Sequence, residues 1–344
     1  MNEQNPAVPP IEAAPLPAYK DRSTGLMVFG ILTLLLGCLV GLFVPLMLFG
    51  QMMAAKAPNA PPANLAAILP AVVIYGGLAV ALIWLGIGSI KAWRWARALL
   101  LIFSWSWLVM GIFMTVVMPF FMAKVFANLP PDASDRPAAN ATGGHHRNDR
   151  FHGSVLCRFF VLVPALWTFF YGSRHVKATC EARDPVTRWT DACPLPVLAI
   201  SLWTWLAVPI MLVMPLTGRA VMPFFGVFLS GLPGGLLCLL IAAVWGWAGW
   251  WLYRLDARGW WLIVIAMVVF MVSALMTYAH HDIVEMYQLQ GMPQAQIDQI
   301  QKIGLFTGNR MGWFTVLFSL PFLGYPIRVV VLAGRAQFPV SFLI

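Results

Sequence analysis

Apolar residues run along this chain in long stretches that polar residues interrupt only briefly. A helix needs about 20 apolar residues to cross a bilayer. Eight stretches meet or approach that length: residues 25–50, 65–90, 98–122, 155–172, 195–216, 229–252, 260–280 and 311–331. The fourth and eighth are the shortest, and they contain Pro164, Pro321 and Pro326. The pattern predicts an all-α integral membrane protein with eight transmembrane helices.

The polar residues divide the chain into five parts. Residues 1–23 form a Pro-rich tail that predicts disorder, because spaced prolines prevent a helix and no core can form. Two membrane units follow, at 24–172 and 195–335. Between them lies a strongly polar stretch, residues 173–194, which we call the seam. Residues 336–344 form a short C-terminal tail.

The two membrane units resemble each other in sequence. Four matches occur in the same order and in the same membrane contexts. They are Val44-Pro45-Leu46-Met47-Leu48 with Val208-Pro209-Ile210-Met211-Leu212; Trp84, Gly88 and Ala96-Arg97 with Trp245, Gly249 and Ala257-Arg258; Pro131 with Pro293; and Tyr171-x-x-Arg174 with Tyr325-x-x-Arg328. The matches predict a 4+4 internal repeat.

An even number of spans in each unit gives both units the same orientation. The repeat would then be parallel, with a pseudo-twofold axis along the membrane normal and a cavity expected between the units. Pro45 and Pro209 would kink matching helices, either to line a path or, as we favour, to fit helices together. Gly37-x-x-x-Gly41 offers a close packing groove. Its counterparts, Ser201 and Trp205, break the symmetry.

Composition and charge support a membrane protein and set its orientation. The chain is 60% apolar and 10% charged, whereas soluble domains average about 45–50% and about 25%. Basic residues concentrate in alternate short segments, as the positive-inside rule requires, which argues against nucleic-acid binding. These segments hold Lys20, Arg22, Lys91, Arg94, Arg97, Arg174, Lys177, Arg183, Arg188, Arg254, Arg258, Arg328 and Arg335. We expect both termini and the seam to be cytoplasmic, and a bacterial inner membrane to be the location.

The first candidate for chemistry lies at the outer end of the seventh span, where the sequence reads His280-His281-Asp282-x-x-Glu285. If the helix continues, His281 and Glu285 share one face and could offer two ligands to a metal. His145, His146 and His152 lie in the matching outer loop. No ligand spacing of a known metal site is present, so a polar helix end is the favoured interpretation.

The seam supplies a second candidate in His175, Cys180 and Cys193, as a zinc site or a redox pair. Without a Cys-x-x-Cys motif, structural use is favoured. Asp184-Pro185 predicts the start of a short helix at the membrane surface, with Asp184 as its N-cap. Arg174 and Arg328 are predicted to anchor helix ends to lipid phosphates or helix carbonyls.

Two outer segments are predicted to lie near the bilayer surface. Residues 219–228 would lie in the interface before the sixth span. Pro293 would open a short amphipathic helix with Ile297, Ile300 and Ile303 on one face. A glycosylation sequon at Asn140-Ala-Thr142 matters only in a secretory compartment.

The functional expectation rests mainly on what the spans lack. No span holds Asp, Glu or Lys near mid-depth, where ion-coupled transporters and pumps need one. Phosphate-binding loops and hydrolase motifs are also missing from the sequence. We therefore expect a non-catalytic scaffold or sensor without a cofactor, with membrane lipids as partners. The alternatives are a facilitator for a neutral or apolar solute between the units, and an outer-face metal-binding protein or enzyme.

Overall fold

The computed structural model describes residues 19–54, 65–127, 158–216, 220–303, 312 and 315–316. The described part of residues 19–194 is helical apart from short connections. Its elements are α1 (Ser23–Ala54), α2 (Leu65–Ile90), α3 (Arg94–Ala127), the π-helix η2 (Arg158–Leu162), α5 (Val163–Gly172), α6 (Arg174–Arg183) and the 3₁₀-helix η3 (Trp189–Asp191).

The described residues from 195 onward contain helices and one β-hairpin. The elements are α7 (Leu195–Leu216), β1 (Met222–Phe224), β2 (Val227–Leu229), α8 (Gly231–Tyr253), α9 (Ala257–His280), α10 (Ile283–Leu289) and α11 (Gln294–Ile303). The two strands pair antiparallel, with Met222 opposite Leu229.

Six of the described helices are long and apolar enough to cross a bilayer: α1, α2, α3, α7, α8 and α9. In the most apolar window of each, only 17% to 28% of the residues are buried by the protein itself. Such broad apolar surfaces on long helices require lipid rather than water as their solvent. The protein is therefore a multi-pass integral membrane protein.

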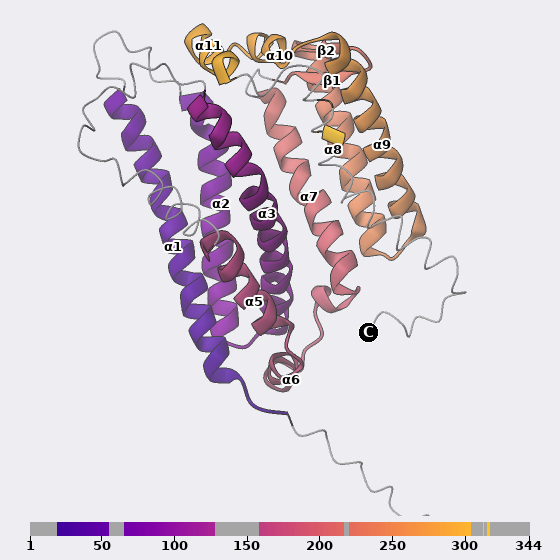
Figure 1. Ribbon diagram of the computed structural model, residues 1–344. Helices are drawn as coiled ribbons and strands as arrows, with labels where there is room; N and C mark the ends of the chain where they lie inside the picture. The colour runs from indigo at the N-terminus through magenta and orange to yellow at the C-terminus, as the bar shows by residue number, and fades with distance from the viewer. Residues whose placement is uncertain are drawn as a thin grey trace, which may run out of the picture.

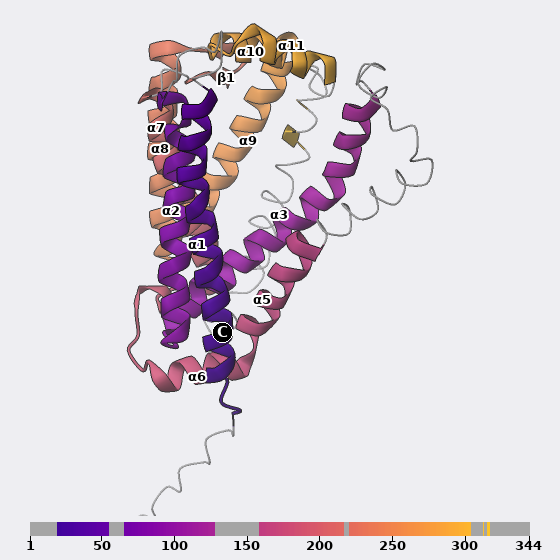
Figure 2. The same ribbon diagram turned by 90° about the vertical axis from the view of Figure 1, so that its left-hand side faces the viewer.

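The six long helices follow one another across the molecule in chain order (Figure 1). Contacts join α1 to α2, α2 to α3, α3 to α7, α7 to α8, and α8 to α9. The seam, with α6, lies at one end of the helices, and the hairpin, α10 and α11 lie at the other (Figure 1). We call these ends the seam side and the outer side. Figure 2 shows α3 and α9 leaning in the same direction away from the helix pairs that precede them.

Helices α1 and α2 approach each other closely through small residues. A Cβ atom added at Gly86 would lie 2.8 Å from Leu34 N and 2.9 Å from Gly30 O. One added at Gly37 would lie 2.9 Å from Ile83 N. Lipid tails are as apolar as leucine, so membrane helices associate largely through such close packing. The close contact predicted at Gly37 is confirmed, and Gly30 and Gly86 extend it toward the seam side.

Helices α7 and α8 are joined by side-chain hydrogen bonds from Ser201 and Trp205, the residues that the sequence comparison placed opposite Gly37 and Gly41. Ser201 Oγ donates to Gly249 O over 2.8 Å, and Trp205 Nε1 donates to Gly246 O over 3.3 Å. Ser201 is fully buried. The sequence departure at Ser201 and Trp205 is therefore a difference in how each helix pair is joined.

Two seam-side turns, between α2 and α3 and between α8 and α9, have the same conformation. Ala92 has φ 56° and Leu255 has φ 59°. The N–H of Ala92 donates to Ser89 O, and the N–H of Leu255 donates to Leu252 O. The next N–H in each turn bonds to the carbonyl five residues back. This is the Schellman closure of a helix, here with a residue other than glycine in the left-handed position.

Placing one of these turns on the other pairs residues differently from the sequence comparison. When Ala92 is placed opposite Leu255, Trp84 falls opposite Trp247 and Gly86 opposite Gly249. The sequence comparison paired Trp84 with Trp245 and Gly88 with Gly249, two residues away from this geometric correspondence. Trp84 and Trp247 are both mostly exposed, and Gly86 and Gly249 both face the preceding helix.

The β-hairpin is fastened to the outer part of α9. The N–H groups of Phe225 and Gly226, at the tip, donate to Ser273 Oγ and Thr277 Oγ1 over 3.0 and 3.1 Å. Ser273 Oγ in turn donates to Pro223 O. The hairpin overlaps the segment 219–228 that was expected at the membrane interface, but the sequence did not predict strands there. Its depth in a bilayer stays a prediction.

The predicted amphipathic helix after Pro293 is confirmed as α11. The carbonyl of Pro293 accepts from the N–H groups of Gln296 and Ile297, as at a helix start. Ile297 is buried, Ile300 is half-buried, and Gln296 and Asp298 are exposed.

Other predicted features are placed only in part. Pro45 and Pro209 both lie inside long helices, α1 and α7. The fourth predicted span is a shorter apolar helix over Phe159–Gly172. The eighth predicted span lies outside the described residues except at Gly312, Thr315 and Val316. Both predicted tails also lie outside them, apart from residues 19–23. Eight spans and the 4+4 repeat therefore stay predictions.

Replacing Gly86 with alanine tests the α1–α2 contact. The new methyl group would press on backbone atoms of α1, so we expect a loss of about 1–3 kcal/mol in unfolding free energy, as for other overpacked sites. Gly77→Ala on the same helix is the control, because a Cβ there meets nothing within 4 Å. Unfolding in mixed micelles measures both. Equal stability of the two variants would contradict the packing described.

Candidate functional site

The seam forms one short helix and one turn that pack across the ends of α1, α3 and α5. Ser173 is the N-cap of α6, and its side chain accepts a hydrogen bond from the N–H of His175. Val176, Thr179 and Cys180 lie on the buried face of α6, whereas Arg174 and Lys177 are exposed. The seam contains a short helix, α6, but this helix precedes Asp184, whereas the helix expected at the membrane surface was to follow it.

Asp184 was predicted to cap a helix that begins at Pro185, and this is wrong. Residues 185–188 are not helical, and the next helical turn is η3. The carboxylate of Asp184 is buried and accepts from the N–H of Arg94, the first residue of α3, over 3.2 Å. Asp184 thus caps a helix distant in sequence, and its negative charge faces the positive end of the α3 dipole.

Arg94 of α3 ties the seam to the long helices. Arg94 contacts Asp191 at 3.3 Å and Glu181 at 3.9 Å. Arg188 pairs with Asp184 at 3.4 Å. Arg97 lies one turn further into α3, and its buried Nε has no hydrogen-bond partner among the described residues. The network is structural in form, because each carboxylate in it faces an arginine or a helix start.

The segment before α1 is held against α6. The N–H of Lys20 donates to His175 Nδ1 over 3.4 Å, and the N–H of Arg22 donates to Thr179 Oγ1 over 3.1 Å. Asp21 pairs with Arg183 at 3.6 Å. Hydrogen bonds from Ser23 hold the pKa of Asp21 below its usual value. His175 therefore helps to hold the segment that leads into α1.

The seam cysteines do not join His175 in a site. Cys180 is buried with Tyr171, Val176 and Trp95 in the core of the first unit. Cys180 and Cys193 are both free thiols. Burial raises the pKa of each to about 11. Over the part of the chain that the structure describes, no three His, Cys, Asp or Glu side chains gather as a metal site would require.

Tyr171 joins three helices in the first unit. Its side chain is fully buried, and its hydroxyl contacts Ser89 Oγ at 2.7 Å, while Ser89 Oγ donates to Leu26 O. One turn earlier, Trp167 Nε1 donates to Thr33 Oγ1. Tyr171 is thus a packing residue, and Arg174 remains exposed beyond it. Tyr325 and Arg328 lie outside the described residues.

The outer histidines divide between two roles. Helix α9 ends at His280, so His281 and Glu285 do not share a continuous helix as expected. They meet nonetheless, with His281 Nδ1 2.6 Å from Glu285 Oε2. His280 Nδ1 bonds to Met276 O of its own helix. His145, His146 and His152 lie outside the described residues, so a metal site shared with them stays a prediction.

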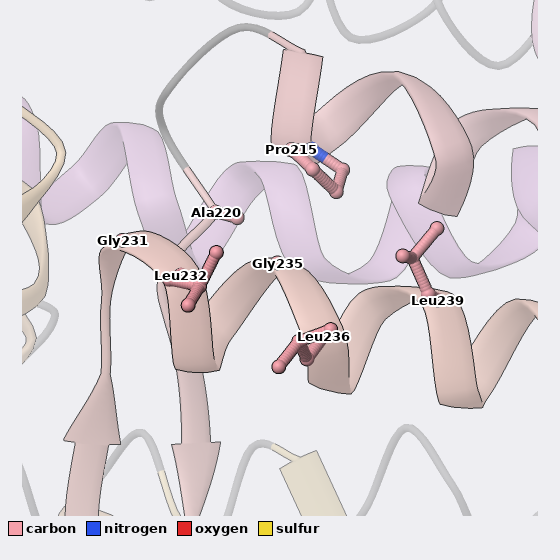
Figure 3. Close-up of a pocket in the computed structure, with 7 residues that line it drawn as sticks. All are labelled: Pro215, Ala220, Gly231, Leu232, Gly235, Leu236 and Leu239. Carbon is pink, nitrogen blue, oxygen red and sulfur yellow. The ribbon is translucent and has the colours of Figure 1, made fainter.

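An apolar hollow of about 330 Å³ lies at the outer ends of α7 and α8 (Figure 3). Pro215 closes one side, Ala220 lies at one end, and Leu232, Leu236 and Leu239 of α8 line the other side. The three leucines are exposed, so the hollow opens toward the apolar surroundings of the bundle. All seven lining residues are apolar or glycine, so their side chains offer no hydrogen bond to a polar solute.

A direct hydrogen bond joins α7 of the second unit to α3 of the first. Trp203 Nε1 of α7 donates to Ser106 Oγ of α3 over 2.9 Å. On the seam side, Tyr253 Oη of α8 donates to Trp189 O of η3. Trp203 is half exposed, so this contact lies at the margin of the bundle. The cavity expected between the units stays a prediction.

Comparison with models of known protein families, with curated proteins and with solved structures finds no match.

Labelling of Cys180 tests whether the seam is a packed structural element. In a variant that keeps only this cysteine, alkylation at neutral pH should be slow and should rise about tenfold per pH unit toward the pKa near 11, because the thiolate is the nucleophile. The control places a lone cysteine at exposed Ala182 in α6. Rapid labelling of both positions at neutral pH would contradict the burial of Cys180.

Proposed function

We propose that this protein is a non-catalytic membrane scaffold or sensor with eight spans in a 4+4 parallel repeat. The observation that supports it best is the use of polar groups within the described spans. Four buried hydroxyl groups donate hydrogen bonds to backbone carbonyls of a helix or of the hairpin, namely those of Ser89, Ser201, Ser273 and Thr277. Hydroxyls committed in this way hold helices together and leave little for substrate chemistry.

The charge distribution supports the same proposal. In the described spans, Arg94, Arg97 and Arg258 lie at seam-side helix ends, and the helices contain no Asp, Glu or Lys at mid-depth. Coupling of transport to ions or protons generally uses such a residue within the membrane. The proposed orientation has the seam and both termini in the cytoplasm of a bacterial inner membrane.

The shared turns support the repeat. A left-handed residue in a Schellman closure appears at both Ala92 and Leu255, although neither is glycine. The repeat is also supported by buried small residues at matching places in α3 and α9. Ala96 of α3 matches Gly259 of α9 near the turn, and Gly111 matches Ala274 further out.

A facilitator for neutral or apolar solutes is the second candidate. The limited contact between α3 and α7 favours it, because loosely packed helices leave room for a path along the interface of the two units. At this interface Trp203 of α7 bonds to Ser106 of α3. An outer-face metal protein is a third, supported by the His281–Glu285 contact alone.

Solute flux into proteoliposomes separates the first two candidates. We expect shrinkage assays with glycerol and urea to give the permeability of protein-free vesicles, because the described interface offers no continuous polar path. A protein-dependent flux that Ser106→Trp abolishes, and that Ile112→Trp at an exposed position of the same helix does not, would establish the facilitator instead.

Metal analysis of the same preparation addresses the third candidate. We expect no stoichiometric metal after purification. A metal retained by the parent protein and lost in a His281→Ala, Glu285→Ala variant would replace the proposal with the metal site.

A further inference from the structure

The two equivalent turns each carry a cation stacked on an indole ring. Lys91 Nζ lies 4.9 Å from the ring centroid of Trp93, and Arg254 Cζ lies 4.6 Å from that of Trp250. Lys91 and Arg254 occupy the same position, directly before the left-handed residue. The indole holds each cation at the point where an apolar span ends, although the ring follows the cation in one turn and precedes it in the other.

These two cations lack ionic partners on the protein. The described ion pairs on the seam side use Arg94, Lys177, Arg183 and Arg188. Neither Lys91 nor Arg254 forms an ion pair with any described residue, and both are exposed. Arg258, near the second turn, is also exposed and likewise unpaired within the described ranges. An anion from outside the protein would therefore find these charges available.

We propose that the Lys91–Trp93 turn and the Arg254–Trp250 turn bind the phosphates of anionic phospholipids in the leaflet on the seam side. Tryptophan rings favour the level of the headgroups, so a cation stacked on one is held where lipid phosphates lie. A cation near an anionic leaflet contributes about 1 kcal/mol, or about fivefold in affinity.

A soluble polyanion such as RNA fits this arrangement less well. Its phosphates run along a continuous chain, and proteins meet them with a continuous basic groove. Here the two turns are separate, and the acidic residues Glu181, Asp184 and Asp191 of the seam bind the arginines nearby. Two separate cations at helix ends are better suited to bind the phosphates of separate lipid headgroups.

The inference rests on the proposed placement of both turns at one membrane face, but not on the absence of transport. A protein that passed glycerol and still bound phosphatidylglycerol at these turns would overturn the proposed function and leave this inference standing. A protein that left vesicle permeability unchanged but did not bind phosphatidylglycerol at these turns would overturn this inference and leave the proposed function standing.

Native mass spectrometry of the delipidated full chain, titrated with phosphatidylglycerol or phosphatidylcholine, provides the test. We expect Lys91→Gln and Arg254→Gln each to weaken phosphatidylglycerol binding about fivefold, and the double variant about 25-fold. Binding of phosphatidylcholine should change little. Lys91→Arg should retain binding, since the charge and the stacking remain.

Arg183→Gln is the matched control, because it removes the same charge from the same side at a residue already paired with Asp21. Helix content and melting in phosphatidylcholine nanodiscs check that each variant folds, and the single variants decide the result if the double variant does not fold. An equal loss in Arg183→Gln, or no loss in either turn variant, would overturn the proposal. Displacement of the lipid by polyuridylate RNA at equal phosphate concentration would assign the face to a soluble polyanion instead.

Discussion

Lipid offers no hydrogen bonds, and this constraint shapes every contact between the long helices. Backbone groups must bond within each helix, and side-chain hydroxyls must find partners inside the protein. The protein therefore joins its helices where side chains are small or where a hydroxyl can reach a carbonyl. Gly30 and Gly86 serve the α1–α2 pair, and Ser201 with Gly249 serves the α7–α8 pair. Both solutions bring backbones close without exposing a polar group.

The seam lies beyond the apolar spans, where water can form hydrogen bonds, and many of the charged residues lie there. Asp184 illustrates the consequence, because its carboxylate is buried against the start of α3 and paired with Arg188. His175 and Thr179 hold the segment that leads into α1, and Tyr171 joins α5 to α1 and α2. The seam is thus the hub of the first unit, and Tyr253 ties the second unit to the same hub.

Sequence patterns predicted the six long helices well. An apolar run that is longer than the buried helices of soluble proteins indicates a lipid surrounding. They also predicted the Gly37 contact and the helix after Pro293. They failed where the signal was conformational, because a left-handed Ala92 or Leu255 cannot be recognised from the sequence when no glycine stands there. For the candidate site, Asp184-Pro185 had the form of a local N-cap. Its actual partner, Arg94, lies 90 residues away in the chain.

The central claim is that both units face the same way in a bilayer, with the seam and the two equivalent turns on one side. Sidedness of single cysteines tests it most directly, using a membrane-impermeant maleimide on intact and inverted vesicles. The account predicts that cysteines at Lys20, Ala182 and Leu255 react only from the cytoplasmic side, and that a cysteine at Gln288 reacts only from the opposite side. Reaction of positions 182 and 255 from opposite sides would contradict it.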